Sequence, residues 1–152
     1  VQSFRWARQY CPNAILILND YNTVELQGDN SRFIDIANRV KAAGAPIDAL
    51  GAQAHGAFNV PTATVQGFID RMASMTGLPV YITEYDIDVA DANRQRDIMQ
   101  SQFTMFWNNP NVSGITLWGY VTGATWLPDT GLMSSGGQQR PAMVWLMDFL
   151  NR

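Results

Sequence analysis

The stretch TGLPVYITEYDIDV, residues 76–89, predicts a helix end, a buried strand and a polar loop in direct succession. Gly77 favours the end of a helix because glycine adopts the left-handed conformation without steric cost, and Pro79 opens an extended segment. The apolar and β-branched residues that follow are typical of a strand. Carboxylates then occupy every second position at the end of this strand: Glu84, Asp86 and Asp88.

The same order of signals occurs four times along the chain. Strands are predicted at 14–20, 47–55, 79–86 and 112–120, and helices over 30–46, 61–77, 91–109 and from Pro141 onward. Asn30 or Ser31 is a candidate N-cap for the first of these helices, and residues 1–13 resemble the last turns of a further helix. Alternating strands and helices with short joints predict right-handed βαβ units on a parallel sheet, which is the α/β fold class.

Composition and charge exclude several classes of protein. The 152 residues are 47% hydrophobic, enough for one sizeable core, and the net charge of −3 argues against nucleic acid or an anionic membrane as a partner. No apolar run approaches the roughly 20 residues of a membrane-spanning helix. Cys11 is the only cysteine and is expected to be a small buried thiol, and a single histidine cannot build a multi-imidazole site. We therefore expect no metal and no cofactor.

The loops that follow the four strands contain the unusual side chains. In parallel α/β folds ligands bind at the carboxyl ends of the strands, so these loops should form one face. A combination of carboxylates, amides, an imidazole and aromatic rings suits a carbohydrate, which offers hydroxyls to polar groups and a C–H face to aromatic rings. The side chains concerned are Asn19, Asp20, Tyr21, Gln53, His55, Glu84, Asp86, Trp118 and Trp126.

Glu84 is the leading catalytic candidate. An ionised carboxylate there could attack an anomeric carbon or stabilise an oxocarbenium-like transition state. Residues two apart lie on the same face of a strand, so Asp86 would repel it, and His55 held between them could orient Glu84 and tune its ionisation. The alternatives are a salt-bridged acid at position 84 and a structural histidine at position 55.

Other conspicuous residues favour structural interpretations. The acids at 88, 91 and 129 are expected to be solvated or to cap helices, and Glu25 is expected to be a loop acid. Trp107 and Trp145 follow helical spacing and are expected to serve packing, not ligand recognition.

Four motifs together resemble a known family. LILNDYN (16–22), PIDALGAQAH (46–55), VYITEYDI (80–87) and GITLWGYVTGATWLP (114–128) resemble, in order and spacing, the last four strands of glycoside hydrolase family 10. That family consists mainly of endo-β-1,4-xylanases on a (β/α)₈ TIM barrel. The resemblance implies that residues 1–152 are part of a single catalytic domain, namely its C-terminal half, strands 5–8 with their helices. The Tyr85 form of the third motif and the C-terminal segment are similar to xylanases of gut-type Bacteroidetes.

The resemblance also implies roles for individual residues. Glu84 matches the nucleophile of a retaining double-displacement mechanism, and His55 and Asp86 match its hydrogen-bonding partners. The substrate-binding positions of the family match Asn19, Tyr21, Gln53, Trp118 and Trp126. The substrate implied is xylan or a xylo-oligosaccharide, and this polymer implies a secreted, periplasmic or cell-surface protein.

One part of the family pattern is absent from these residues. The general acid/base is a glutamate that follows an asparagine at the end of the fourth strand, and the chain contains no Asn-Glu pair. We therefore expect the N-terminal half-barrel to supply it as a partner, and this chain alone to be inactive. Two alternatives stay open: a glycan-binding half-barrel without catalysis, and a retaining β-1,4-glucanase or mannanase on the same barrel.

Overall fold

The computed structural model describes residues 1–151 and alternates strands with helices along the chain. The elements are, in order, α1 (Gln2–Tyr10), β1 (Ile17–Asp20), α2 (Gln27–Ala42), β2 (Ala49–Ala52), the short 3₁₀ helix η1 (Ala57–Asn59), α3 (Thr62–Thr76), β3 (Val80–Tyr85), α4 (Ala92–Asn108), β4 (Val112–Leu117) and α5 (Pro141–Leu150).

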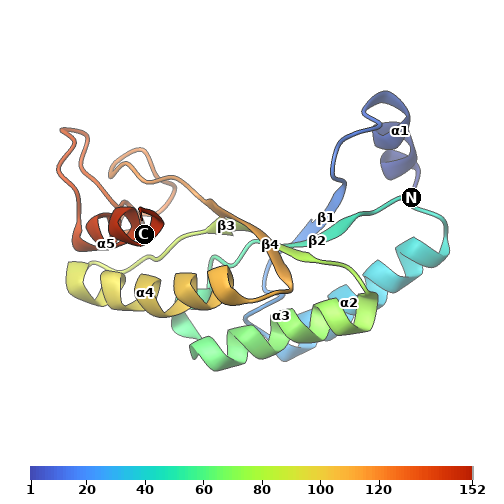
Figure 1. Ribbon diagram of the computed structural model, residues 1–152, viewed down its shortest axis with the longest axis horizontal. Helices are drawn as coiled ribbons and strands as arrows, with labels where there is room; N and C mark the ends of the chain where they lie inside the picture. Colours follow the sequence, from blue (N-terminus) through green and yellow to red (C-terminus); the bar gives the residue numbers. More distant parts are fainter. Residues whose placement is uncertain (152) are drawn as a thin grey trace.

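Within residues 1–151 the four strands form one parallel sheet in the order β1-β2-β3-β4. Each strand therefore pairs with the next one in the sequence, and the intervening helix lies outside the sheet. Figure 1 shows α2, α3 and α4 lined up along the same side of the strands. The predicted α/β class with parallel strands is confirmed.

The hydrophobic core fills the layer between the strands and these helices. Burying apolar side chains between two layers is what holds a sheet and its helices together. The strands contribute Leu50, Ala52, Val80, Ile82 and Tyr85, and the helices contribute Phe33, Ile34, Val65, Ile69, Met72, Met99, Phe103 and Phe106.

The strands are shorter than the sequence predicted: β1 at its amino end, β4 at its carboxyl end, and β2 and β3 at both ends. The ladder between β1 and β2 ends at the pair Asp20 and Ala52, and that between β3 and β4 ends at Tyr85 and Leu117. Strand pairing stops there because the chain turns outward into the long loops. The residues predicted to carry chemistry therefore lie in the last residues of the strands or in the loops that follow them.

The predicted start of the first long helix was wrong. Helix α2 begins at Gln27 with Leu26 at its N-cap position, so neither Asn30 nor Ser31 caps it. Asn30 is buried instead, and its side-chain amide donates to the carbonyl oxygens of Thr23 (2.8 Å) and Phe68 (3.2 Å). Asn30 thus ties α2 to its neighbours, a use of asparagine that local sequence does not distinguish from capping.

The other helix ends follow the predicted chemistry. Gly77 ends α3 in the left-handed conformation (φ +69°), and Pro141 lies in the first turn of α5. Asp91 caps α4, because its carboxylate accepts hydrogen bonds from the backbone N–H groups of Asn93 and Arg94. These bonds hold the pKa of Asp91 below its ordinary value.

One prediction of burial was wrong. Cys11 is exposed, because it follows directly on α1, a helix with no buried residue. Trp107 packs as predicted, stacked on Phe103 and edge-on against Phe149, although 58% of the residue is exposed. Trp145 does pack against the core, stacked on Phe149, as predicted.

Candidate active site

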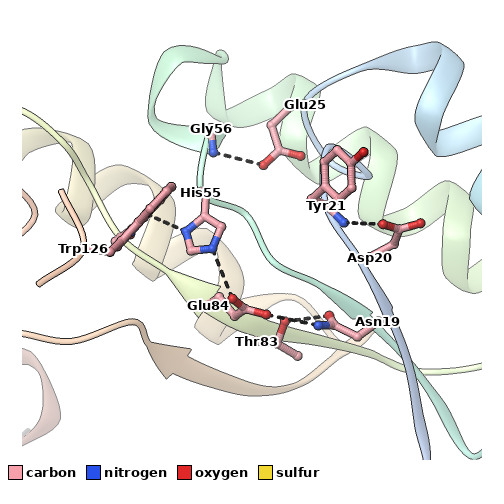
Figure 2. A network of polar contacts seen from close by, with 10 residues as sticks. Asn19, Asp20, Tyr21, Glu25, His55, Gly56, Thr83, Glu84 and Trp126 are labelled. Carbon is pink, nitrogen blue, oxygen red and sulfur yellow. Dashed lines mark hydrogen bonds and ion pairs between the residues drawn. The ribbon is translucent and has the colours of Figure 1, made fainter.

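Polar side chains meet where the parallel strands end. Asn19 lies in β1, His55 follows β2, Glu84 lies near the end of β3, and Trp118 follows β4 directly. Because the carboxyl ends of parallel strands share one edge of the sheet, these side chains converge. Figure 2 shows Asn19, His55 and Glu84 pointing toward one another.

His55 lies between two carboxylates. Its Nε2 is 3.1 Å from Oε2 of Glu84 (Figure 2), and its Nδ1 is 3.0 Å from Oδ1 of Asp86. A neutral imidazole carries one N–H, whereas ionised carboxylates only accept hydrogen bonds. A neutral ring can therefore donate to only one of the two carboxylates, and donation to both at once would need a proton on each ring nitrogen.

Glu84 reaches this position through an irregularity in β3. The pairing register with β4 shifts between Ile82 and Tyr85, and both of these side chains are fully buried in the helix-facing core. Strict alternation along the strand would have placed Glu84 on the same face as Ile82. With the shift, Thr83 and Glu84 both reach Asn19 across the open face of the sheet.

Asn19 holds the second oxygen of Glu84. Its Nδ2 donates to Oε1 of Glu84 at 3.1 Å, while its Oδ1 accepts from the Thr83 hydroxyl at 2.8 Å. The Glu84 carboxylate fixes which way the amide faces, because an ionised carboxylate only accepts hydrogen bonds. Gly51 leaves room for it, because a Cβ at that position would lie 2.4 Å from Oδ1 of Asn19. Both carboxylate oxygens of Glu84 thus have a nitrogen partner.

Asp86 is the buried member of the group, with 1% of its side chain exposed. Its Oδ2 accepts a hydrogen bond from the indole Nε1 of Trp126 at 2.5 Å, and its Oδ1 contacts His55. Burial raises the pKa of Asp86, and the bonds from Trp126 and His55 act against that rise. Trp126 is therefore linked to Glu84 through Asp86 and His55.

The remaining predicted residues surround this group without a direct bond to it. Tyr21 is 64% exposed, and Gln53 is half-buried with its backbone N–H on the carbonyl oxygen of Asp20. The ring of Trp118 is edge-on to His55 at 6.1 Å between centroids. The exposed aromatic faces are available to a ligand.

Glu25 was predicted only as a loop acid, and it braces the segment that carries His55. Its Oε1 accepts from the N–H of Gly56 at 3.3 Å and its Oε2 from the N–H of Val24 at 3.0 Å. Burial raises the pKa of Glu25. Ala54, next to His55, has φ +64°, a conformation unusual for a residue with a side chain. No spacing in the sequence signals this brace.

Asp88 stands apart from the catalytic candidates. Its carboxylate accepts the backbone N–H of Asp129 at 3.1 Å, which joins two loops. Across residues 1–151, no group of three or more His, Cys, Asp or Glu side chains is arranged to hold a metal ion. The chemistry that these residues offer is that of an oriented carboxylate beside exposed aromatic rings.

Comparison with known proteins decides the family. The model of glycosyl hydrolase family 10 matches residues 1–149. The chain belongs to glycosyl hydrolase family 10. Endo-1,4-beta-xylanase B of Cellvibrio japonicus is 47% identical over 150 residues, and the bifunctional endo-1,4-beta-xylanase XylA of Ruminococcus flavefaciens is 32% identical over 146 residues.

Solved structures of family 10 xylanases agree with the fold. Xylanase 10B from Thermotoga maritima matches with a TM-score of 0.85 at 25% identity, and so does xylanase 10B from Thermotoga petrophila in complex with xylobiose. Each match covers 99% of this chain and about half of the other, 51% and 50% respectively. The chain thus folds as part of a TIM barrel.

The chain spans a still smaller share of its curated relatives. It covers 24% of the Cellvibrio japonicus protein and 15% of the Ruminococcus flavefaciens protein, while 98% and 93% of the chain itself is matched. Those proteins therefore contain much that has no counterpart in these 152 residues.

Proposed function

We propose that this chain supplies the nucleophile side of a retaining endo-β-1,4-xylanase. The observation that carries the proposal is the orientation of Glu84, whose two oxygens are each met by a nitrogen, from Asn19 and from His55. Family membership and the xylanase relatives support the substrate class. So does the xylobiose bound to the Thermotoga petrophila enzyme.

In the proposed reaction an oxygen of Glu84 attacks the anomeric carbon of a xylosyl unit. The bond from that carbon to the glycosidic oxygen breaks, and the leaving oxygen takes a proton from a second carboxyl about 5–5.5 Å away. Water then gives a proton to that second carboxylate and adds to the anomeric carbon, which releases Glu84. The sugar is inverted twice, so its configuration is retained.

His55 and Asp86 have supporting roles in this proposal. A hydrogen bond from the ring to Oε2 fixes the direction of Glu84, and the Asp86 carboxyl holds the ring in place. A preorganised donor needs no rearrangement as charge changes at the nucleophile. Asn19, Tyr21, Gln53, Trp118 and Trp126 are proposed to contact the sugars.

The second carboxyl is proposed to come from the other half of the barrel. Both outer strands of the sheet have a free edge, and an apolar hollow lies beside β4, lined in part by Phe103, Trp107, Val112, Leu117 and Leu146. Closing the sheet into a barrel removes such edges and covers such surfaces. We therefore infer that four further β/α units complete a single catalytic domain with this chain.

The proposed site of action is outside the cytoplasm, because polymeric xylan is met there. Within residues 1–151 none of the helices has the length and hydrophobicity to cross a bilayer.

The direct test is a Glu84→Gln variant of the complete barrel that includes this chain. The amide keeps the shape of the side chain and removes the nucleophile, so xylan hydrolysis should fall by at least about a thousandfold. Asp35→Asn is the matched control, because Asp35 is an exposed acid on α2. Retention of most activity by Glu84→Gln would rule out the assignment.

Two further measurements separate the alternatives. A 2-deoxy-2-fluoro xylobioside should leave a glycosyl group on the peptide that contains Glu84, detected by mass spectrometry, if the mechanism is retaining. Parallel assays on xylan, β-1,4-glucan and mannan distinguish a xylanase from the related enzymes. Binding of xylan without hydrolysis of any of the three polymers would favour the non-catalytic alternative.

A further inference from the structure

Two loops next to the site are tied together by one arginine. The loop between β4 and α5 carries Trp126, and the loop between β3 and α4 begins with Asp86. Arg140, the N-cap residue of α5, reaches from the end of the first loop to the second. It donates to the carbonyl oxygens of Asp129 (3.1 Å), Gly131 (3.1 Å), Val89 (3.0 Å) and Ala90 (2.9 Å).

The shape of the guanidinium matches these four acceptors. The terminal nitrogens of arginine carry four hydrogens in a fixed plane, and here Nη1 serves the loop after β4 while Nη2 serves the loop after β3. A lysine has its three donors on one nitrogen and cannot span two loops in this way. The contact therefore depends on arginine and not on positive charge alone.

Two more side chains join the same pair of loops. The buried Gln95 in α4 donates through Nε2 to the carbonyl oxygens of Ile87 (3.1 Å), Asp129 (2.9 Å) and Gly131 (3.3 Å). The Asp88 carboxylate accepts the N–H of Asp129. Three ties from different elements thus converge on residues 129–131, shortly after Trp126.

What these ties hold in place is the indole of Trp126. Trp126 is 57% exposed, so packing alone does not fix its ring, yet its indole N–H donates to the buried carboxylate of Asp86 at 2.5 Å. A donor on an exposed loop keeps such a bond only when the loop itself is held. Loss of that bond would leave Asp86 with His55 as its remaining side-chain partner among those described.

We propose that Arg140 is a positioning residue of the active site, which acts by holding Trp126 on Asp86 and thereby orients His55 and Glu84. The inference rests on the proposed function, because it assigns a catalytic consequence to Glu84. Arg140 itself contacts backbone carbonyls and not the substrate. The effect on catalysis is transmitted through one identified hydrogen bond.

The test is a double-mutant cycle in the complete barrel, with Arg140→Met and Trp126→Phe. Each single change should lower kcat on xylan by about tenfold to a hundredfold, the usual value of one hydrogen bond to a charged group. The double variant should lose little more than either single one, because both remove the same bond. Met72→Ala, in the buried core of α3, is the control for destabilisation and should leave kcat unchanged while the protein stays folded.

The indole N–H resonance of Trp126 gives a readout that does not depend on activity. It is assigned by its absence in Trp126→Phe, and in Arg140→Met it should move upfield toward the position of a solvent-exposed indole. If the unmodified barrel hydrolyses no xylan, the proposed function fails. The shift of the indole resonance still tests whether Arg140 holds Trp126 on Asp86. If Arg140→Met does not fold, Arg140→Lys takes its place under the same criteria.

Multiplicative losses of kcat in the double variant would overturn the proposal, since the two residues would then act independently. So would an unchanged kcat, or an unmoved indole resonance, in the folded Arg140 variant.

Discussion

The fit between Gly51 and Asn19 leads to a quantitative prediction for Gly51→Ala. A methyl group at position 51 would lie 2.4 Å from Oδ1 of Asn19 and 3.0 Å from its Cβ and Cγ, closer than real side chains approach. Gly51 does not have a positive φ, so alanine can adopt its backbone conformation. The substitution therefore acts only through the steric clash with Asn19. The Asn19 side chain would have to rotate away.

The size of the effect follows from the two bonds that Asn19 would lose. Overpacking of this kind lowers the free energy of unfolding by about 1–3 kcal/mol. The hydrogen bond to Glu84 involves a charged group and has a value of about 1.5–3 kcal/mol, which corresponds to about a 10- to 150-fold loss in kcat/KM. The bond between Asn19 and Thr83 is neutral and contributes less.

The assay compares Gly51→Ala with Asn19→Ala and the double variant, all in the complete barrel. Asn19→Ala removes Oδ1 and Cγ and leaves only the Cβ of residue 19, 3.0 Å from the added methyl group. Gly51→Ala should therefore lower urea stability and kcat/KM much less in that background than in the unmodified barrel. Gly67→Ala in α3 is the matched control, since a Cβ there meets nothing within 4 Å. The reasoning would be refuted if Gly51→Ala lowered urea stability and kcat/KM equally with and without the Asn19 side chain. Unchanged urea stability and kcat/KM in Gly51→Ala alone would refute it as well.

Two further changes test the interior and the buried carboxyl. Tyr85→Phe removes a buried hydroxyl that donates to Oε1 of Gln102 at 3.0 Å, so urea denaturation should show a loss of about 1–3 kcal/mol, whereas the exposed Tyr10→Phe should show none. Burial raises the pKa of Asp86 above its ordinary value of 3.8, so the folded protein binds this proton more tightly than the unfolded chain does. The stability that results is fully present below pH 3.8 and is lost as the pH rises through the raised pKa. Asp86→Asn lacks that loss, so its free energy of unfolding relative to that of the unmodified protein should increase as the pH is raised above 3.8. A difference that does not vary with pH would contradict the assignment.

The order of elements could be predicted because it depends on local chemistry. The glycine at 77 and the proline at 141 mark helix boundaries through their own backbone preferences, and the structure places both there. Asn30 shows the limit of this kind of inference. Its amide can satisfy either a helix end or a buried carbonyl, and only the neighbouring helix, which brings Phe68 close, decides between them.

Which side chains of the site contact one another also depends on the tertiary structure. The sequence indicated that Glu84, His55 and Asp86 belong together, because strand ends of a parallel sheet share one edge. It did not contain the register shift in β3, the space at Gly51, or the brace from Glu25. Each of these joins residues far apart in the chain.

The sequence by itself determined the α/β class, the family and the set of side chains at the strand ends, since periodicity, turn residues and motifs are local properties of the chain. The tertiary structure decided which atoms meet: the imidazole between two carboxylates, the indole on Asp86 and the guanidinium that joins two loops. The physical reason is that hydrogen bonds of this kind depend on distances of about 3 Å between segments whose separation in space is set by the packing of the whole sheet and its helices.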